Sequence, residues 1–214
     1  MTKQGALMFL KNAWYVAAWS SEVTHDLQQI LVLEKKICLY RRSDNTITAL
    51  EDACPHRKLP LSKGRLKDDT IECGYHGLTF NGQGNCIWAP GNGLIPPKAV
   101  VHAYPIHEKY DLVWIWMGDP ALADAADIID IPNFDHPEWG INRGATMELQ
   151  CNYLLMCDNL LDPTHVAWVH QDSFAQSAAK DTPLEITQTD TGYIVHRWMM
   201  DVEPAPFYKK IVPF

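Results

Sequence analysis

Short apolar runs, separated by turn-forming residues, fill the first half of the chain and predict β-strands. They are rich in Ile, Leu, Val and aromatic residues, which favour strands. The segment Asn81-Gly82-Gln83-Gly84 joins two of these runs and is a strong hairpin signal. We therefore expect residues 1–120 to form an all-β domain. The candidate strands are residues 29–33, 36–40, 46–50, 78–80, 86–88 and 112–116.

The pattern changes after residue 120. Residues 121–140 mix scattered acidic residues with prolines, which is typical of a connecting segment on the surface. Residues 141–214 are expected to form a second unit, so that the fold class of the whole chain is α+β. Its predicted elements are a strand at 147–151, a helix over 154–169 interrupted at Pro163, and a hairpin of 186–189 with 193–196.

Composition narrows the class of protein. The chain has 214 residues, of which 47% are hydrophobic, and a formal net charge of −8. This excludes a disordered chain and argues against nucleic acid as a partner. The apolar run at residues 6–10 is too short for a signal peptide core or a membrane span. The scattered cysteines do not form a disulfide framework, so we predict a cytoplasmic protein with no membrane contact.

Two short cysteine–histidine pairs carry the most specific chemical signal. They are Cys54-Pro55-His56 and Cys73-Gly74-Tyr75-His76, with sixteen residues between His56 and Cys73. A Rieske [2Fe–2S] cluster needs this set, because two cysteines hold one of its irons and two histidines hold the other. The alternative is a Cys₂His₂ zinc site, which usually has a close Cys pair followed by a close His pair. The mixed pairs favour the Rieske cluster.

A second group of metal-capable residues lies between Asn159 and His170. His165 and His170 are five residues apart, so a regular helix would turn their side chains away from each other. Pro163 indicates a break, with Asp162 as the N-cap of a new helical segment, and the break could let both imidazoles approach one ion. The alternative is that the two histidines pack separately. In a soluble protein, a Rieske cluster needs an acceptor for its electron. This need favours the interpretation of a second iron held by two His and a carboxylate.

Together these motifs resemble the oxygenase component of Rieske non-haem iron oxygenases. The closest branch is that of the aromatic demethylases, which includes vanillate O-demethylase, dicamba demethylase and toluenesulfonate methyl-monooxygenase. The resemblance implies an all-β Rieske domain followed by the N-terminal portion of a helix-grip (START-like) catalytic domain. The third iron ligand, an Asp, would lie beyond residue 214, and the chain would be C-terminally incomplete. The motifs are residues 12–19, 54–57, 75–78, 113–120 and 158–162.

The resemblance also implies roles for single residues. His165 and His170 would bind a mononuclear Fe(II), and Asn159 would lie near this iron without binding it. Asp162 would connect His165 to the cluster ligand His76 of the partner subunit in a homotrimer. A carboxylate that accepts hydrogen bonds from two imidazoles orients both rings.

The implied activity is O₂-dependent monooxygenation of a small aromatic compound, by O-demethylation or methyl hydroxylation. Electrons would come from NAD(P)H through a separate flavin and iron–sulfur reductase. Two alternatives remain open, namely a ring-hydroxylating dioxygenase that forms cis-dihydrodiols and a Rieske electron carrier without oxygenase activity. The segment 159–170 argues against the carrier, which has no need of it.

Overall fold

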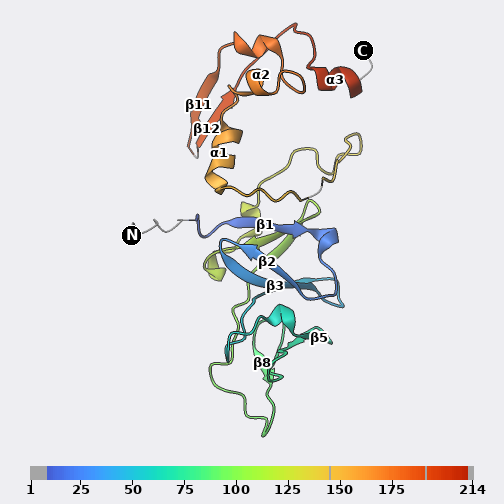
Figure 1. Ribbon diagram of the computed structural model, residues 1–214, viewed down its shortest axis with the longest axis vertical. Helices are drawn as coiled ribbons and strands as arrows, with labels where there is room; N and C mark the ends of the chain where they lie inside the picture. Colours follow the sequence, from blue (N-terminus) through green and yellow to red (C-terminus); the bar gives the residue numbers. More distant parts are fainter. Residues whose placement is uncertain (1–8, 145, 191, 212–214) are drawn as a thin grey trace. The chain divides into compact units, whose positions relative to one another are not determined.

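The computed structural model describes residues 9–144, 146–190 and 192–211. The chain divides into two compact units, Met1–Asn142 and Arg143–Phe214 (Figure 1). Apart from short 3₁₀ turns, the described part of the first unit is built from strands, whereas the second unit contains α-helices and a hairpin. The predicted α+β class is thereby confirmed.

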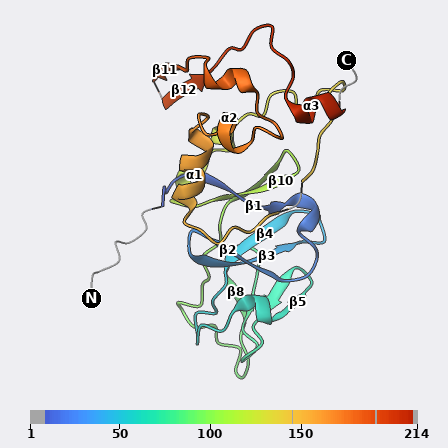
Figure 2. The ribbon, with the colours of Figure 1, turned by 45° about the horizontal axis from the view of Figure 1, so that its top comes forward.

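The first unit contains three small antiparallel sheets that follow one another in layers (Figures 1 and 2). The middle sheet has the order β2-β3-β4, and one of its neighbours has the order β1-β10-β9. The other neighbour, β5-β6-β7-β8, carries the second Cys–His pair in the loop between β6 and β7. The strands are β1 Trp14–Trp19, β2 Gln28–Val32, β3 Lys35–Arg41, β4 Ile47–Glu51, β5 Arg65–Lys67, β6 Thr70–Glu72, β7 Thr79–Phe80, β8 Cys86–Trp88, β9 Ile106–Lys109 and β10 Leu112–Trp116.

Strand β3 explains how the layers share their cores. Its four residues from Ile37 to Tyr40 are fully buried, because both faces of the strand are covered. Ile37 and Leu39 belong to the core shared with β10, whereas Cys38 and Tyr40 belong to the core that contains Cys54 and Cys73. Successive side chains on a strand point to opposite faces, so a strand covered on both sides reads as an unbroken apolar run. The loops that carry Cys54 and Cys73 thus pack against a buried sheet.

The second unit has few buried residues in its described part. The predicted helix is confirmed as two helices with a break after Leu161, and the predicted hairpin is confirmed as β11 with β12. No described helix of the chain is both long and apolar enough to cross a membrane. The elements are α1 Tyr153–Leu161, α2 Val166–Val169, β11 Glu185–Thr189, β12 Gly192–His196 and α3 Pro206–Ile211.

Two predictions about the second unit are wrong. Residues 147–151 form no strand, since no neighbouring strand pairs with them in the described chain and a lone strand leaves its backbone groups unsatisfied. Asp162 is not the N-cap of the second helix. It is the C-cap of α1, and His165 takes the N-cap position of α2. Four residues, from Asp162 to His165, separate the two helices, whereas the prediction started the second helix directly after Asp162.

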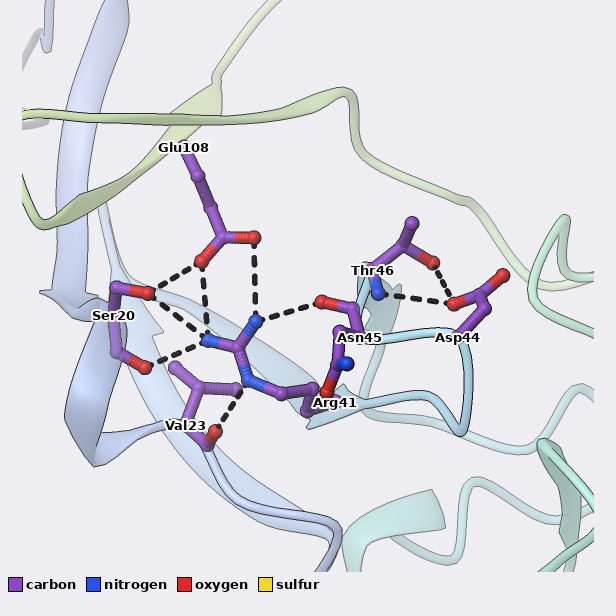
Figure 3. Close-up of polar contacts among 7 residues, drawn as sticks. All are labelled: Ser20, Val23, Arg41, Asp44, Asn45, Thr46 and Glu108. Atoms are coloured by element: carbon purple, nitrogen blue, oxygen red, sulfur yellow. Dashed lines mark hydrogen bonds and ion pairs between the residues drawn. The ribbon is translucent and has the colours of Figure 1, made fainter.

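Arg41, at the end of β3, ties the middle sheet to its neighbour (Figure 3). Its guanidinium forms an ion pair with Glu108 on β9, with an N–O distance of 3.1 Å. It also donates to the carbonyl oxygens of Ser20, Val23 and Asn45 at 2.7, 3.0 and 2.7 Å. The fixed fork of the guanidinium lets one side chain satisfy all of these acceptors. Burial raises the pKa of Glu108, but hydrogen bonds from Arg41 and Ser20 outweigh it, and the pKa falls below its ordinary value.

We expect Arg41→Met to lower the free energy of unfolding by about 2–4 kcal/mol, because it leaves a partly buried carboxylate and three carbonyls without their donor. Urea-induced unfolding of the protein measures this. The control is Arg42→Met, since Arg42 makes longer contacts of 3.6 and 4.0 Å with the carboxylates of Asp44 and Asp69. It should cost about 1 kcal/mol or less. Equal losses in the two variants would contradict the proposed role of Arg41.

Candidate metal centres

The loop after β4 holds the first Cys–His pair in a tight turn. The backbone N–H of Cys54 donates to the Leu59 carbonyl at 2.9 Å, and the N–H of Lys58 donates to the Cys54 carbonyl at 2.8 Å. Lys58 has a φ of +59°, a left-handed conformation that lets the chain turn back. The turn leaves the Cys54 side chain buried and the His56 side chain exposed.

The loop between β6 and β7 repeats this geometry with different residues. The N–H of Cys73 donates to the Leu78 carbonyl at 2.8 Å, and the N–H of Gly77 donates to the Cys73 carbonyl at 3.0 Å. Gly77, with a φ of +77°, occupies the position that Lys58 has in the first loop. Cys73 is buried and His76 is exposed. The two loops therefore present one cysteine and one histidine each in the same way.

The four side chains meet at the tips of the two loops. The imidazole centroids of His56 and His76 are 4.6 Å apart, and both histidines and both cysteines line one small hollow. The thiols lie on its inner side, with Cys54 2% and Cys73 1% exposed. This fits a dinuclear cluster whose inner iron is bound by thiolates and whose outer iron is bound by imidazoles.

The surroundings of Cys54 act on its thiol in opposite directions. Burial, together with the neighbouring Cys73, raises the pKa of Cys54 to about 11. The backbone N–H groups of His56 and Arg57 donate toward the sulfur and lower the pKa. Such donors stabilise a negatively charged sulfur, so the loop offers the hydrogen bonds that a bound thiolate needs.

The proline-rich segment after β8 lies beside the exposed histidines. Its residues and both imidazoles line an open cleft of about 550 Å³. The cleft is mainly apolar, which lowers the access of water to the outer side of the hollow. The lining residues are Pro55, His56, His76, Leu78, Ala89, Pro90, Leu94, Pro96, Lys98 and Ala99.

We expect Gly77→Ala to lower the free energy of unfolding by about 1–2 kcal/mol, since an L-residue at this φ is strained. The added Cβ would meet only the Trp88 ring at 3.5 Å, an ordinary contact, so the cost comes from the backbone. Urea unfolding and acid-labile sulfide per chain measure the two effects. Gly91→Ala is the control for backbone strain alone, because Gly91 has a similar positive φ but lies outside the two cysteine–histidine loops. It should lose similar stability and keep its sulfide, whereas Gly77→Ala should also lose sulfide. Equal sulfide content in the two variants would refute this account.

The second candidate centre lies at the short helix α2. His165 is the N-cap of α2 and His170 is its C-cap, so both histidines lie at the ends of the helix and not within it. Their ring centroids are 5.5 Å apart at an interplanar angle of 67°. Phe174 stacks on the imidazole ring of His170, with 4.4 Å between the two ring centroids. The structure thus brings together the two imidazoles that the sequence placed five residues apart.

Asp162 contacts His165 through its backbone and not through its carboxylate. Nδ1 of His165 lies 2.5 Å from the Asp162 carbonyl oxygen. The carboxylate accepts hydrogen bonds from the hydroxyl and the backbone N–H of Thr164, the latter at 2.8 Å, and these bonds lower the pKa of Asp162. Asn159 lies in the last turns of α1 with an exposed side chain. In the described chain, no hydrogen bond joins Asn159 to either histidine.

In the described part of the chain, no three His, Cys, Asp or Glu side chains are close enough to hold a single metal ion. A structural zinc ion needs four donors around one point, whereas a [2Fe–2S] cluster distributes its four ligands over two irons. The arrangement of Cys54, His56, Cys73 and His76 thus suits the cluster better than zinc. His165 and His170 supply two of the donors that a mononuclear iron requires.

The fold and the two cysteine–histidine loops define an iron–sulfur protein of the Rieske class. Residues 13–105 match the Rieske [2Fe-2S] domain, and residues 149–214 match the vanillate O-demethylase oxygenase C-terminal domain. The chain belongs to the Rieske non-haem iron oxygenase family, in the branch of the aromatic demethylases and monooxygenases. This confirms the resemblance seen in the motifs, and it confirms the predicted [2Fe–2S] cofactor.

Two curated relatives illustrate the range of this branch. The toluene-4-sulfonate monooxygenase system iron-sulfur subunit TsaM1 of Comamonas testosteroni is 43% identical over 211 residues, which are 97% of this chain and 60% of the relative. The oxygenase component of chloroacetanilide N-alkylformylase from Rhizorhabdus wittichii is 37% identical over 201 residues, covering 92% of this chain and 57% of the relative. The chain thus spans about 60% of the length of the first.

Solved structures of dicamba monooxygenase closely resemble the structure of this chain. The structure bound to dicamba has a TM-score of 0.86 and 36% sequence identity, and it covers 95% of this chain and 61% of the neighbour. The structure with non-haem iron and dicamba has a TM-score of 0.74 and 35% identity, covering 94% of this chain and 58% of the neighbour.

Proposed function

We propose that this chain is part of the terminal oxygenase component of a multicomponent Rieske oxygenase. The single observation that carries this proposal is the presence, in one chain, of a Rieske cluster site and a converging His165–His170 pair. An electron carrier needs only the first of these sites. In Rieske oxygenases, the second site is a mononuclear iron with open positions for O₂.

The residues of the first site hold the cluster. Cys54 and Cys73 bind the buried iron, and His56 and His76 bind the exposed iron. Imidazole ligands leave the cluster less negative than four thiolates would, so its potential is raised. Because the histidines are the exposed ligands, electrons enter and leave on their side.

The residues of the second site hold the mononuclear Fe(II), which supplies O₂ activation beside the substrate. His165 and His170 would each provide a nitrogen donor, and the Asp162 carbonyl, 2.5 Å from Nδ1 of His165, would orient that ring and leave its other nitrogen free to bind the metal. Asn159 would lie near the iron without binding it. A site of this kind takes a carboxylate as its third ligand.

The reaction that follows is O₂-dependent monooxygenation of an aromatic compound by O-demethylation or methyl hydroxylation. Electrons come from NAD(P)H through a flavin and iron–sulfur reductase, in the cytoplasm. The working unit is a homotrimer, in which the Asp162 carboxylate meets His76 of the partner subunit. The domain bounds that we propose are residues 1–120 for the Rieske domain, 121–140 for the connection and 141–214 for the catalytic part.

Product analysis tests this function. The protein, a reductase and NADH are incubated under ¹⁸O₂ with vanillate or toluene-4-sulfonate as probes. From toluene-4-sulfonate we expect an alcohol with one labelled oxygen. From vanillate we expect an unlabelled phenol and formaldehyde, which carries the labelled oxygen because the hydroxylated methyl carbon leaves with it. A diol with two labelled oxygens would identify a dioxygenase. Electron uptake by the cluster without an oxygenated product from any aromatic probe would identify a carrier.

We expect Asp162→Asn to leave both iron centres filled and to slow turnover by about a hundredfold or more, since it removes the carboxylate charge proposed to meet His76 of the partner subunit, while the Asp162 carbonyl that contacts His165 is kept. The asparagine oxygen can still accept the hydrogen bonds of Thr164, so the turn is kept. The measurement is the rate of cluster reoxidation in a single turnover. Thr164→Val is the control, because it removes one of these hydrogen bonds and keeps the carboxylate. Normal reoxidation in Asp162→Asn would exclude the connecting role.

A further inference from the structure

Asp52 is a buried carboxylate beside the first cluster loop, and neither candidate metal centre uses it as a ligand. It lies directly after β4 and two residues before Cys54, and it is 3% exposed. Among the described residues, no other acidic or basic side chain is buried. Acidic side chains are almost never fully buried without a paired partner, so the surroundings of Asp52 require an explanation.

The hydrogen-bond partners of Asp52 are all neutral groups. Its carboxylate accepts from the backbone N–H of Ser62 at 2.7 Å and from the Ser62 hydroxyl at 2.8 Å. The side-chain amide of Gln29 is the third donor. In the part of the chain that the structure describes, no lysine, arginine or histidine forms an ion pair with Asp52. A carboxylate only accepts hydrogen bonds, so these donors suit its charged form and leave one negative charge in the core without a counter-ion.

These hydrogen bonds connect the carboxylate to a turn that contacts both cluster loops. Ser62 belongs to the 3₁₀ helix η2, Leu61–Lys63, which lies beside β5 in Figure 1. The last residue of η2 also packs against the second loop, because a Cβ added to Gly74 would lie 3.0 Å from its carbonyl oxygen. Gly74 directly follows Cys73 in the chain. The carboxylate is thus joined through one short helix to the second loop, and through its own backbone to the first.

The charge of Asp52 acts on the core that contains the cluster thiols. Cys38, Cys54 and Cys73 belong to one buried group of residues. Burial, and after it the negative charge of Asp52, raises the pKa of the Cys38 thiol above its ordinary value. Charges are weakly screened in such a core, because its effective dielectric constant is far below that of water. A cluster held by Cys54 and Cys73 therefore lies within the electrostatic reach of this carboxylate.

We propose that Asp52 lowers the reduction potential of the [2Fe–2S] cluster through its buried negative charge. Reduction adds one electron to the cluster, and a nearby negative charge makes this addition less favourable. The potential of an iron–sulfur cluster depends on the net charge and the burial of its surroundings. Asp52 thus acts against the imidazole ligands, which raise the potential, and makes the reduced cluster a stronger electron donor. This inference rests on the cluster and not on the proposed oxygenase reaction, so failure of that reaction would leave it intact.

A redox titration of the cluster-loaded protein, followed by visible absorption and EPR, tests this role. Asp52→Asn removes the charge and keeps the shape, since the Ser62 hydroxyl and the Gln29 amide can turn to accept hydrogen bonds from the new amide. At a fixed potential, we expect the ratio of reduced to oxidised cluster to rise about tenfold, which corresponds to about 59 mV for one electron. The matched control is Glu51→Gln, which removes a neighbouring negative charge. Glu51 lines an open cleft, where water screens its charge, so its shift should be much smaller.

A second variant compensates the charge instead of removing it. Gln29→Lys places an ammonium group beside the carboxylate and should raise the potential relative to the neutral variant Gln29→Met. An unchanged potential in Asp52→Asn, with full iron and sulfide, overturns the inference and leaves Asp52 a structural role only. Equal shifts in Asp52→Asn and Glu51→Gln also overturn it, since the overall charge of the protein would then be responsible. If Asp52→Asn assembles no cluster, the comparison of Gln29→Lys with Gln29→Met decides, and equal potentials in that pair overturn the inference.

Discussion

Replacement of Cys73 by serine is expected to abolish the [2Fe–2S] cluster. Acid-labile sulfide should fall from about two per chain to background, and the EPR signal of the reduced protein should disappear. The reason is geometric as well as chemical. Cys73 is 1% exposed and lies at the inner side of the hollow, so no solvent ligand can replace its sulfur without opening the core. A serine hydroxyl is also a far poorer ligand for iron than a thiolate.

The matched control is Cys86→Ser, in the same core. Cys86 is 9% exposed and belongs to the same apolar cluster as Cys73, but its sulfur donates to the Trp88 carbonyl at 3.2 Å. A serine hydroxyl can make that hydrogen bond, so this variant should keep the cluster and lose about 1–2 kcal/mol of stability or less. Equal loss of sulfide in both variants would mean that the core, and not the ligand, is responsible.

The two clearest strands in the sequence are strongly buried. The runs at 36–40 and 112–116 correspond to β3 and β10, which are buried by layers on both sides or by a partner sheet. Burial on both faces demands an unbroken apolar run, and such a run is visible without any structure. Turn residues between the runs fixed the hairpins.

Two of the strands that were missed, β5 and β6, are short and polar. β5 and β6 form a hairpin in which Glu72 pairs with Arg65 and Lys67, with N–O distances of 2.6 Å to each. Asp68 and Asp69, both with positive φ, form its tight turn. The signal was present, as opposite charges on either side of an Asp-Asp turn, but it is weak because polar strands depend on the neighbouring sheet for their stability.

The sequence predicted the residues of the two candidate sites in different detail. The sequence specified the four residues at the cluster loops because their spacing is specific to one kind of cofactor. It also suggested that a break near Pro163 would bring His165 and His170 together, and the rings are 5.5 Å apart. It could not show that Asp162 would use its carbonyl toward His165. This contact depends on the backbone course of an irregular segment, which has no periodic pattern.

Replacement of His170 by alanine is expected to remove the mononuclear iron and to spare the cluster. Iron per chain should fall by about one while acid-labile sulfide stays at about two, because the two centres share no ligand. Oxygenated product should fall to background, whereas reduction of the cluster by a reductase should continue. The Rieske EPR signal supplies the internal reference for correct folding of the first unit.

The control for this variant is His196→Ala. His196 is in the same unit, but Nε2 lies 3.1 Å from the carboxylate of Glu185, so its role is to pair two strands. It should keep its iron. If His170→Ala retained the full iron content, the ring pair would be a packing contact, as its stacking on Phe174 would also allow. The approach of the two imidazoles at the two ends of α2 would then have no role in metal binding. Loss of one iron in this variant alone therefore distinguishes an oxygenase site from a packed histidine pair.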